Sequence, residues 1–173
     1  MAGAYQSNRV LSGLLAFVAP AIAYAAPVSP AVKPPSQAQL MRPLTLAKLA
    51  DMDFGMLGVT TAGTAVLNAV TDTITTTGGV TALGGSPHAA KFRGVAQGSA
   101  VVNIKVPNKA LTLTRVGGTQ TIVIDSFTLD GQSKRTLAQA GIFDFKVGAT
   151  LRPAANQAEG LYTGTFDVTI QYP

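Results

Sequence analysis

The stretch Gly160–Tyr172 reads GLYTGTFDVTIQY, and it decides the fold class of this chain. From Thr165 onward, polar and apolar side chains alternate with a period of two, which is the pattern of a strand with one face in the core. The apolar face consists of Phe166, Val168, Ile170 and Tyr172. We therefore predict one long closing strand that places these four side chains in the core.

The rest of the chain from Pro43 has the same texture. Short runs rich in Val, Ile, Thr and Phe alternate with turn residues, and no stretch keeps the 3.6-residue period of a helix. We expect turns at Gly78-Gly79, Gly84-Gly85, Gly117-Gly118 and Asp130-Gly131, and one short helical turn at 133–140. We expect further strands at 44–49, 64–70, 71–77, 89–96, 100–106, 120–129 and 141–151. The pattern predicts an all-β protein, an immunoglobulin-like β-sandwich of about seven to nine antiparallel strands.

Residues 1–25 have the layout of a secretory signal peptide. A polar start carrying Arg9 precedes an apolar run from Val10 to Ala23, and Ala23-Tyr24-Ala25 forms an A-x-A cleavage site. The run contains Pro20 and is shorter than the ~20 residues that cross a membrane, so we expect export and no transmembrane helix after cleavage. Residues 26–42 are then a Pro-rich extended leader, and residues 43–173 are the sandwich domain.

The composition excludes several kinds of chemistry. The 173 residues contain no Cys, no Trp and one His, which removes disulfide frameworks, cysteine-based zinc sites and thiol nucleophiles. Without Arg9, 12 cationic side chains face 8 acidic ones, but the cations are scattered and almost no aromatic residue accompanies them. Nucleic acid is therefore not an expected partner, and we expect no cofactor and no metal site.

Two motifs suggest catalysis but lack the context that it requires. Asp51-Met52-Asp53-Phe54-Gly55 contains the D-F-G triplet of protein kinases, without their glycine-rich and catalytic loops. We interpret it as a strand that ends in a turn, with Phe54 buried and Gly55 at the bend. Ser86 and His88 are neighbours, but the glycine of a nucleophile elbow is missing after the serine. We expect no enzyme, and a hydrolase that uses Ser86 and His88 is a competing hypothesis.

Three stretches resemble an uncharacterised family of exported bacterial β-sandwich domains. They are the strand that closes on Met52-Asp53-Phe54-Gly55, the glycine-rich loop at 78–87, and the closing stretch at 155–172. This resemblance covers residues 43–172. More distantly, the first and last stretches are similar to spore coat protein U domains and archaic chaperone–usher pilins. Those pilins usually carry a cysteine pair near the first strand, which this chain lacks.

The distant resemblance implies an incomplete immunoglobulin-like sandwich that assembles into surface fibres by donor-strand complementation. We accordingly expect a non-catalytic structural subunit of a bacterial cell-surface fibre, pilus or coat, located at the cell surface, outside the cell or in the periplasm. The implied partners are further copies of the chain, a periplasmic chaperone and an outer-membrane usher. The alternative is a self-contained monomeric periplasmic or secreted binding domain.

The amphipathic segment at 40–49 has two possible roles. Leu40, Leu44 and Leu46 share one phase, so they form a candidate subunit-contact strand that could pair with the edge of a neighbouring subunit. The same segment could instead be the first strand of its own domain. Pro43 lacks an N–H group and would interrupt a donated strand that begins before it.

Overall fold

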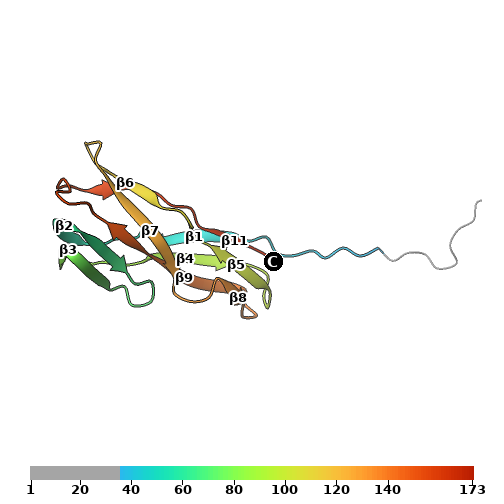
Figure 1. Cartoon of the computed structure of the whole chain (residues 1–173). Coiled ribbons are helices and arrows are strands. Elements are labelled where there is room, and N and C mark those ends of the chain that lie inside the picture. Colours follow the sequence, from blue (N-terminus) through green and yellow to red (C-terminus); the bar gives the residue numbers. More distant parts are fainter. Residues whose placement is uncertain (1–35) are drawn as a thin grey trace, which may run out of the picture. The chain divides into compact units, whose positions relative to one another are not determined.

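The computed structural model describes residues 36–173, and its sandwich lies in the compact unit Gln39–Pro173. This part of the chain contains eleven strands in two sheets (Figure 1). The prediction of an all-β sandwich is confirmed. The predicted signal peptide and the leader up to residue 35 lie outside the described residues. Among the residues that are described, no helix is long and apolar enough to cross a membrane.

The larger sheet is antiparallel and centres on the long strand β9. The N-terminal half of β9 pairs with β4, its C-terminal end pairs with β2, and its other edge pairs with β7. The β2–β3 hairpin joins the sheet through this short β2–β9 ladder. The order is β1 (Thr45–Ala50), β4 (Ala90–Val95), β9 (Ile142–Arg152), β7 (Thr121–Leu129), β6 (Leu111–Arg115) and β10 (Tyr162–Thr163), with β2 (Met56–Leu67) and β3 (Ile74–Gly84) beside β9.

The smaller sheet has three strands and covers only one end of the larger one. Its order is β11 (Thr169–Gln171), β5 (Val101–Lys105) and β8 (Lys134–Thr136). In Figure 1 these strands lie near the C-terminus, while β2, β3, β6 and β10 lie at the opposite end.

The core is divided in the same way. Where the two sheets face each other, Phe145 and Val147 of β9 and Val102 of β5 are completely buried. At the other end, the side chains that pack against a second buried cluster are only partly buried themselves, and they include those of segment 51–59 and Tyr162. We call this second cluster the open-end cluster; its members are Ala65, Val80, Ile122, Ile124, Ala149 and Leu151.

Three local predictions were wrong, and in each case the reason is how the strands pair in the sheets. The expected helical turn at 133–140 contains β8, because residues 134–136 find a partner in β5. The pair Gly78-Gly79 is not a terminal turn, because it lies inside β3 opposite a register shift in β2. The closing strand is not continuous, because residues 164–168 cross between the two sheets without a ladder partner. Strand β6 was not predicted at all.

Candidate functional site

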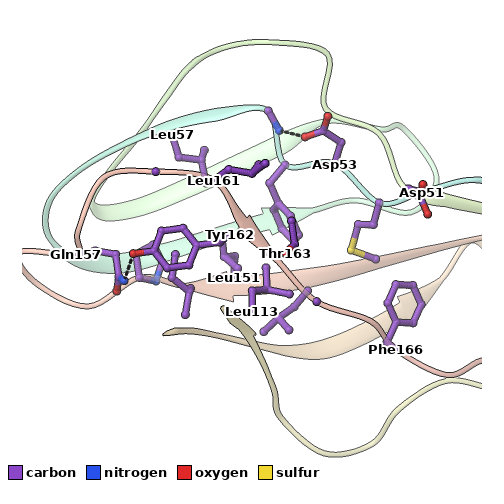
Figure 2. A pocket seen from close by; sticks show the side chains of 18 of the residues that line it. Asp51, Asp53, Leu57, Leu113, Leu151, Gln157, Leu161, Tyr162, Thr163 and Phe166 are labelled. Carbon is purple, nitrogen blue, oxygen red and sulfur yellow. Dashed lines mark hydrogen bonds between the residues drawn. The ribbon is translucent and has the colours of Figure 1, made fainter. Parts of the chain in front are cut away.

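An open groove leads from the surface to the open-end cluster. Its volume is about 980 Å³, and buried Ile122, Ile124 and Leu151 contribute to its lining. Leu57 and Leu161 also line it, with Tyr162 between Leu161 and Leu113 in Figure 2. A groove that reaches core residues is unusual in a finished sandwich, because the second sheet normally covers them.

Two extended segments line this groove. The first is 51–59, in which Met52 and Phe54 are partly buried against the core while Asp51 and Asp53 are exposed. The second is 157–166, which continues through the unpaired residues 164–168. Both segments therefore have alternating side chains, and part of the main chain of each is not paired in a β-ladder.

The polar residues of the groove hold its two sides in shape. Asp53 Oδ1 accepts a hydrogen bond from the Gly55 N–H at 2.7 Å, and Gly55 has φ +68°, so the turn predicted at Gly55 is present. On the other side, the Tyr162 hydroxyl donates to the Ala158 carbonyl and accepts from Gln157 Nε2, both at 2.7 Å (Figure 2).

The charged residues of the groove are mostly acidic. Asp51, Asp53 and Glu159 line it together with Lys48, which forms an ion pair with Asp51. The groove is thus an apolar channel with an acidic rim.

The structure separates the members of the candidate subunit-contact strand. Leu44 and Leu46 are partly buried against the core of their own domain, and Leu46 lies in β1, paired with Gly94 of β4. Leu40 is 98% exposed. In this conformation the segment from Thr45 is the domain's own first strand, at one edge of the larger sheet, and Leu40 lies outside that strand.

The four predicted core residues of the closing stretch lie on one face. Phe166, Val168 and Ile170 pack against the cluster around Phe145, and Tyr172 packs against the cluster around Val102. The Tyr172 hydroxyl donates to the Arg42 carbonyl at 2.7 Å, which joins the C-terminus to the point where the chain enters β1.

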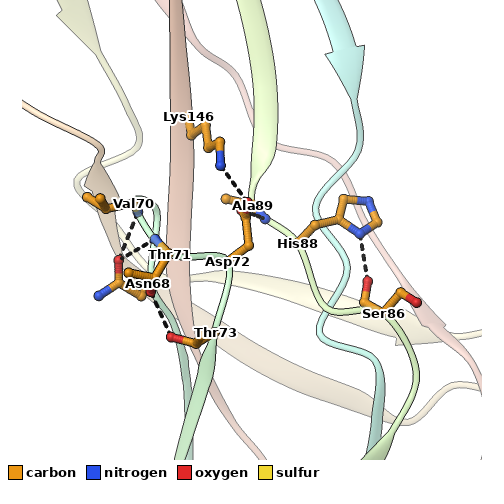
Figure 3. Close-up of polar contacts among 9 residues, drawn as sticks. All are labelled: Asn68, Val70, Thr71, Asp72, Thr73, Ser86, His88, Ala89 and Lys146. Atoms are coloured by element: carbon orange, nitrogen blue, oxygen red, sulfur yellow. Dashed lines mark hydrogen bonds and ion pairs between the residues drawn. The ribbon is translucent and has the colours of Figure 1, made fainter.

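Ser86 and His88 do not form a nucleophile–base pair in this structure. His88 Nδ1 hydrogen bonds to the main-chain carbonyl of Ser86 at 2.7 Å, not to its hydroxyl (Figure 3). The main chain of His88 pairs with Asp53 in an isolated bridge. Within residues 36–173, no three His, Asp or Glu side chains gather in a way that could hold a metal ion.

A polar clasp fixes the loop between β2 and β3. Asp72 accepts a hydrogen bond from the Ala89 N–H at 2.9 Å and forms an ion pair with Lys146 of β9 (Figure 3). The Lys146 hydrogen bond, followed by that from Ala89, lowers the pKa of Asp72 below its ordinary value of 3.8. Asn68 Oδ1 accepts from the Val70 N–H at 2.8 Å and so closes the turn itself.

Other carboxylates are held by arginine. Arg93 binds Asp144 with two hydrogen bonds of 2.7 and 2.8 Å, and Arg152 binds Asp125 at 2.6 Å. These hydrogen bonds lower the pKa of both carboxyl groups. Each carboxylate therefore has an electrostatic partner on a neighbouring strand.

The sequence pattern did not reveal the groove. Its decisive residues are Leu57, Leu83 and Leu161, which are ordinary leucines in segments expected to be turns or strand ends. The only available signal was the mismatch between the long apolar alternation of the closing stretch and its two glycines, Gly160 and Gly164.

Comparison with known proteins gives a family but no named relative. Residues 44–172 match the family model described as Domain of unknown function (DUF4402). The match includes every strand of the sandwich and both sides of the groove. No curated protein and no solved structure matches the chain.

Proposed function

The chain belongs to the DUF4402 family, and we propose that it is a non-catalytic structural subunit of a bacterial cell-surface fibre, pilus or coat. In this proposal its groove receives an extended segment from a neighbouring copy. The observation that carries it is the open apolar groove of about 980 Å³ at the uncovered end of the core.

An inserted strand is the occupant that best suits both sides of the groove. A strand offers N–H and C=O groups on both edges and side chains on alternate faces, so it can satisfy unpaired backbone while filling an apolar channel. Residues 164–168 supply such unpaired backbone on one side. The open-end cluster supplies the apolar surface that the inserted side chains would cover.

The segment 36–41 is the best candidate for the inserted strand. It is the part of the leader after Pro35 that contains no proline, and all of its residues are exposed. Leu40 supplies a fully exposed apolar side chain. No acidic residue occurs between residues 26 and 50, and the leader carries Lys33 and Arg42, so its charge complements the acidic rim of the groove.

The position of this segment favours a neighbour's groove over the chain's own. Arg42 is bound by Tyr172 at one end of β1, and Asp51 lines the groove just beyond the other end. Strand β1 spans about 20 Å between these points. The segment before Arg42 therefore starts at the end of β1 remote from the groove, and contacts of this kind between copies repeat head to tail.

The proposal includes the route to the surface. Signal peptide 1–25 would direct export, and the distant similarity to chaperone–usher pilins and spore coat protein U domains suggests a periplasmic chaperone and an outer-membrane usher as assembly partners. A chaperone strand could fill the groove before a neighbouring copy does.

The test is complementation between two blocked variants of the mature chain 26–173. Leu40→Asp spoils the inserted segment and leaves the groove, whereas Leu161→Asp spoils the groove and leaves the segment. We expect wild type to form concentration-dependent multimers by light scattering and threads by negative-stain microscopy. Each variant alone should stay monomeric, and their mixture should stop at dimers.

Val70→Asp is the matched control, because Val70 is 62% exposed and lies in the β2–β3 loop, outside both the groove and the leader. It should multimerise like wild type. A wild-type chain that stays monomeric at all concentrations, and that fails to bind a peptide of residues 36–43, would support the monomeric binding domain instead.

A further inference from the structure

A break in the ladder divides the β2–β3 hairpin into two halves. The register shifts between Val59 and Gly63, and Gly78 on the opposite strand has φ +66°. A Cβ on Gly63 would lie 2.1 Å from the Thr77 carbonyl oxygen, so the strands approach too closely here for any other residue. Bulges of this kind bend a hairpin, and the two halves are held differently.

The half next to the β2–β3 loop is anchored. Ala65 and Val66 pair with Leu151 and Thr150 of β9, and Leu67 is 1% exposed. The Asp72 clasp ties the adjoining loop to β4 and β9 (Figure 3).

The other half, Met56–Val59 with Val80–Gly84, is a different case; we call it the strap. Its ladder pairs join only β2 to β3. Its attachment to the domain is apolar: Val80 is itself a buried member of the open-end cluster, and half-buried Leu57 and Val59 pack against that cluster. At the end of the strap remote from the register shift, Gly55, Gly84 and Gly85 all have positive φ, at +68°, +134° and +89°.

Large apolar side chains stand exposed around the mouth of the groove. Met56 and Leu83 of the strap are 60% and 65% exposed, and Leu161 on the opposite side is 67% exposed. Leu83 and Leu161 both line the groove. Exposed apolar surface beside unpaired strand edges is a hazard for a free subunit, and bringing the two sides together would bury it.

We infer that the strap is a hinged cover of the groove. It turns about residues 60–63 and Gly78-Gly79, closes Leu83 onto Leu161 in the free subunit, and lifts to admit a strand. This inference rests on the proposed function only for what enters the groove. The motion itself belongs to the isolated chain.

Hydrogen exchange along single strands tests the hinge. Exchange rates are measured by mass spectrometry on the full mature chain. Only amides that are hydrogen-bonded within the β2–β3 ladder are compared. We expect strap amides to exchange at least ~10-fold faster than those of 64–67 and 74–77, because local opening exposes the weakly held unit first. Equal rates in both halves would show that the hairpin opens as one body and would overturn the hinge.

Two valine truncations sharpen this comparison. Val80→Ala removes the buried contact of the strap and should raise strap exchange by a further ~10-fold, with little change in the anchored half. Val66→Ala makes the same chemical change in the anchored half, where Val66 is 40% exposed, and should leave strap rates unaltered. Acceleration of both halves by Val80→Ala would contradict the inference.

An engineered disulfide tests whether the strap closes. Because the chain has no native cysteine, two introduced cysteines have no other thiol within the chain to pair with. Leu83→Cys with Leu161→Cys should cross-link on mild oxidation, whereas Leu83→Cys with Val70→Cys, in the loop at the anchored end of the hairpin, should not. The strap amides of the oxidised first pair should exchange more slowly than those of the same variant after reduction. Absence of the cross-link, or unchanged strap exchange in the cross-linked form, would overturn the strap. Failure of unmodified wild type to multimerise would count against the proposed function alone.

Discussion

Truncation of Phe166 gives the most direct measure of how the closing segment is held. Phe166 lies within the unpaired residues 164–168 and lines the groove. Its ring meets Phe92 edge-on at 6.4 Å between centroids and lies 5.2 Å from the ring of Phe127. No ladder supports the backbone here, so the ring packing is the main local attachment.

The expected loss follows from partial burial and two ring contacts. A fully buried Phe→Ala change costs about 3–5 kcal/mol, and a half-buried side chain forfeits roughly half of that. Each aromatic pair contributes about 0.5–1.5 kcal/mol beyond its buried area. We expect Phe166→Ala to lower the free energy of unfolding by about 2.5–5.5 kcal/mol. Thr165→Ala, on the exposed face, should cost less than about 0.5 kcal/mol.

Urea unfolding followed by far-ultraviolet circular dichroism measures both variants. With a slope of about 1–3 kcal/mol/M, the midpoint of Phe166→Ala should fall by roughly 1 M or more, while that of Thr165→Ala should hardly move. The protein must be dilute enough to be monomeric, because association shifts apparent stability. Equal losses at the two positions would show that the alternation does not set which face is buried, and the reasoning would fail.

Three further outcomes test the polar contacts and the close approaches. Because the pKa of Asp72 is depressed in the folded state, its carboxylate stabilises the fold above the ordinary value of 3.8, and this stabilisation is lost as the pH falls through the lower folded value. The urea midpoint should therefore stay constant from neutral pH to about 5 and decline below about 4. The decline should be smaller in Asp72→Asn. Gly148→Ala would place a Cβ 2.2 Å from the Leu67 carbonyl oxygen and should cost more than about 2 kcal/mol, whereas Gly131→Ala meets only Arg135 at 3.5 Å and should change the melting temperature little. Arg135→Met would break the 2.6 Å ion pair with Asp130 and should destabilise the chain by about 1–3 kcal/mol in thermal unfolding, with Arg135→Lys recovering only part of the loss.

The all-β class and most strands were predictable because alternation is a local property. In β5 and β11 the sequence identified both the strand and its buried face: Val102 and Ile104 are 0% and 3% exposed, and Ile170 faces the core. The pattern worked there because one face of each strand touches the core and the other touches solvent.

What depended on pairing could not be predicted in the same way. Strand β6 contains Leu111 and Leu113 in the right alternation. It follows the turn residues Pro107-Asn108, and no strand was predicted there. The three residues of β8 carry no pattern of their own. They form a strand because they pair with β5, and the side chain of Arg135 among them is held by Asp130. The break at 164–168 arises because the closing segment must leave one sheet and join the other, and a single side-chain pattern describes both parts.

The groove exists because the small sheet covers only part of the larger one. Three strands cover the end of the core that contains Phe145, and the eight-stranded sheet extends well beyond them. The uncovered end cannot be closed by cross-linking, because the chain has no cysteine. Two elements cover part of it instead: the bent hairpin, which contributes Val80 to the open-end cluster, and β10, whose Tyr162 packs against that cluster. Both elements leave strand edges and leucines exposed, and in the proposed function this exposed surface is the one that a neighbouring strand would cover.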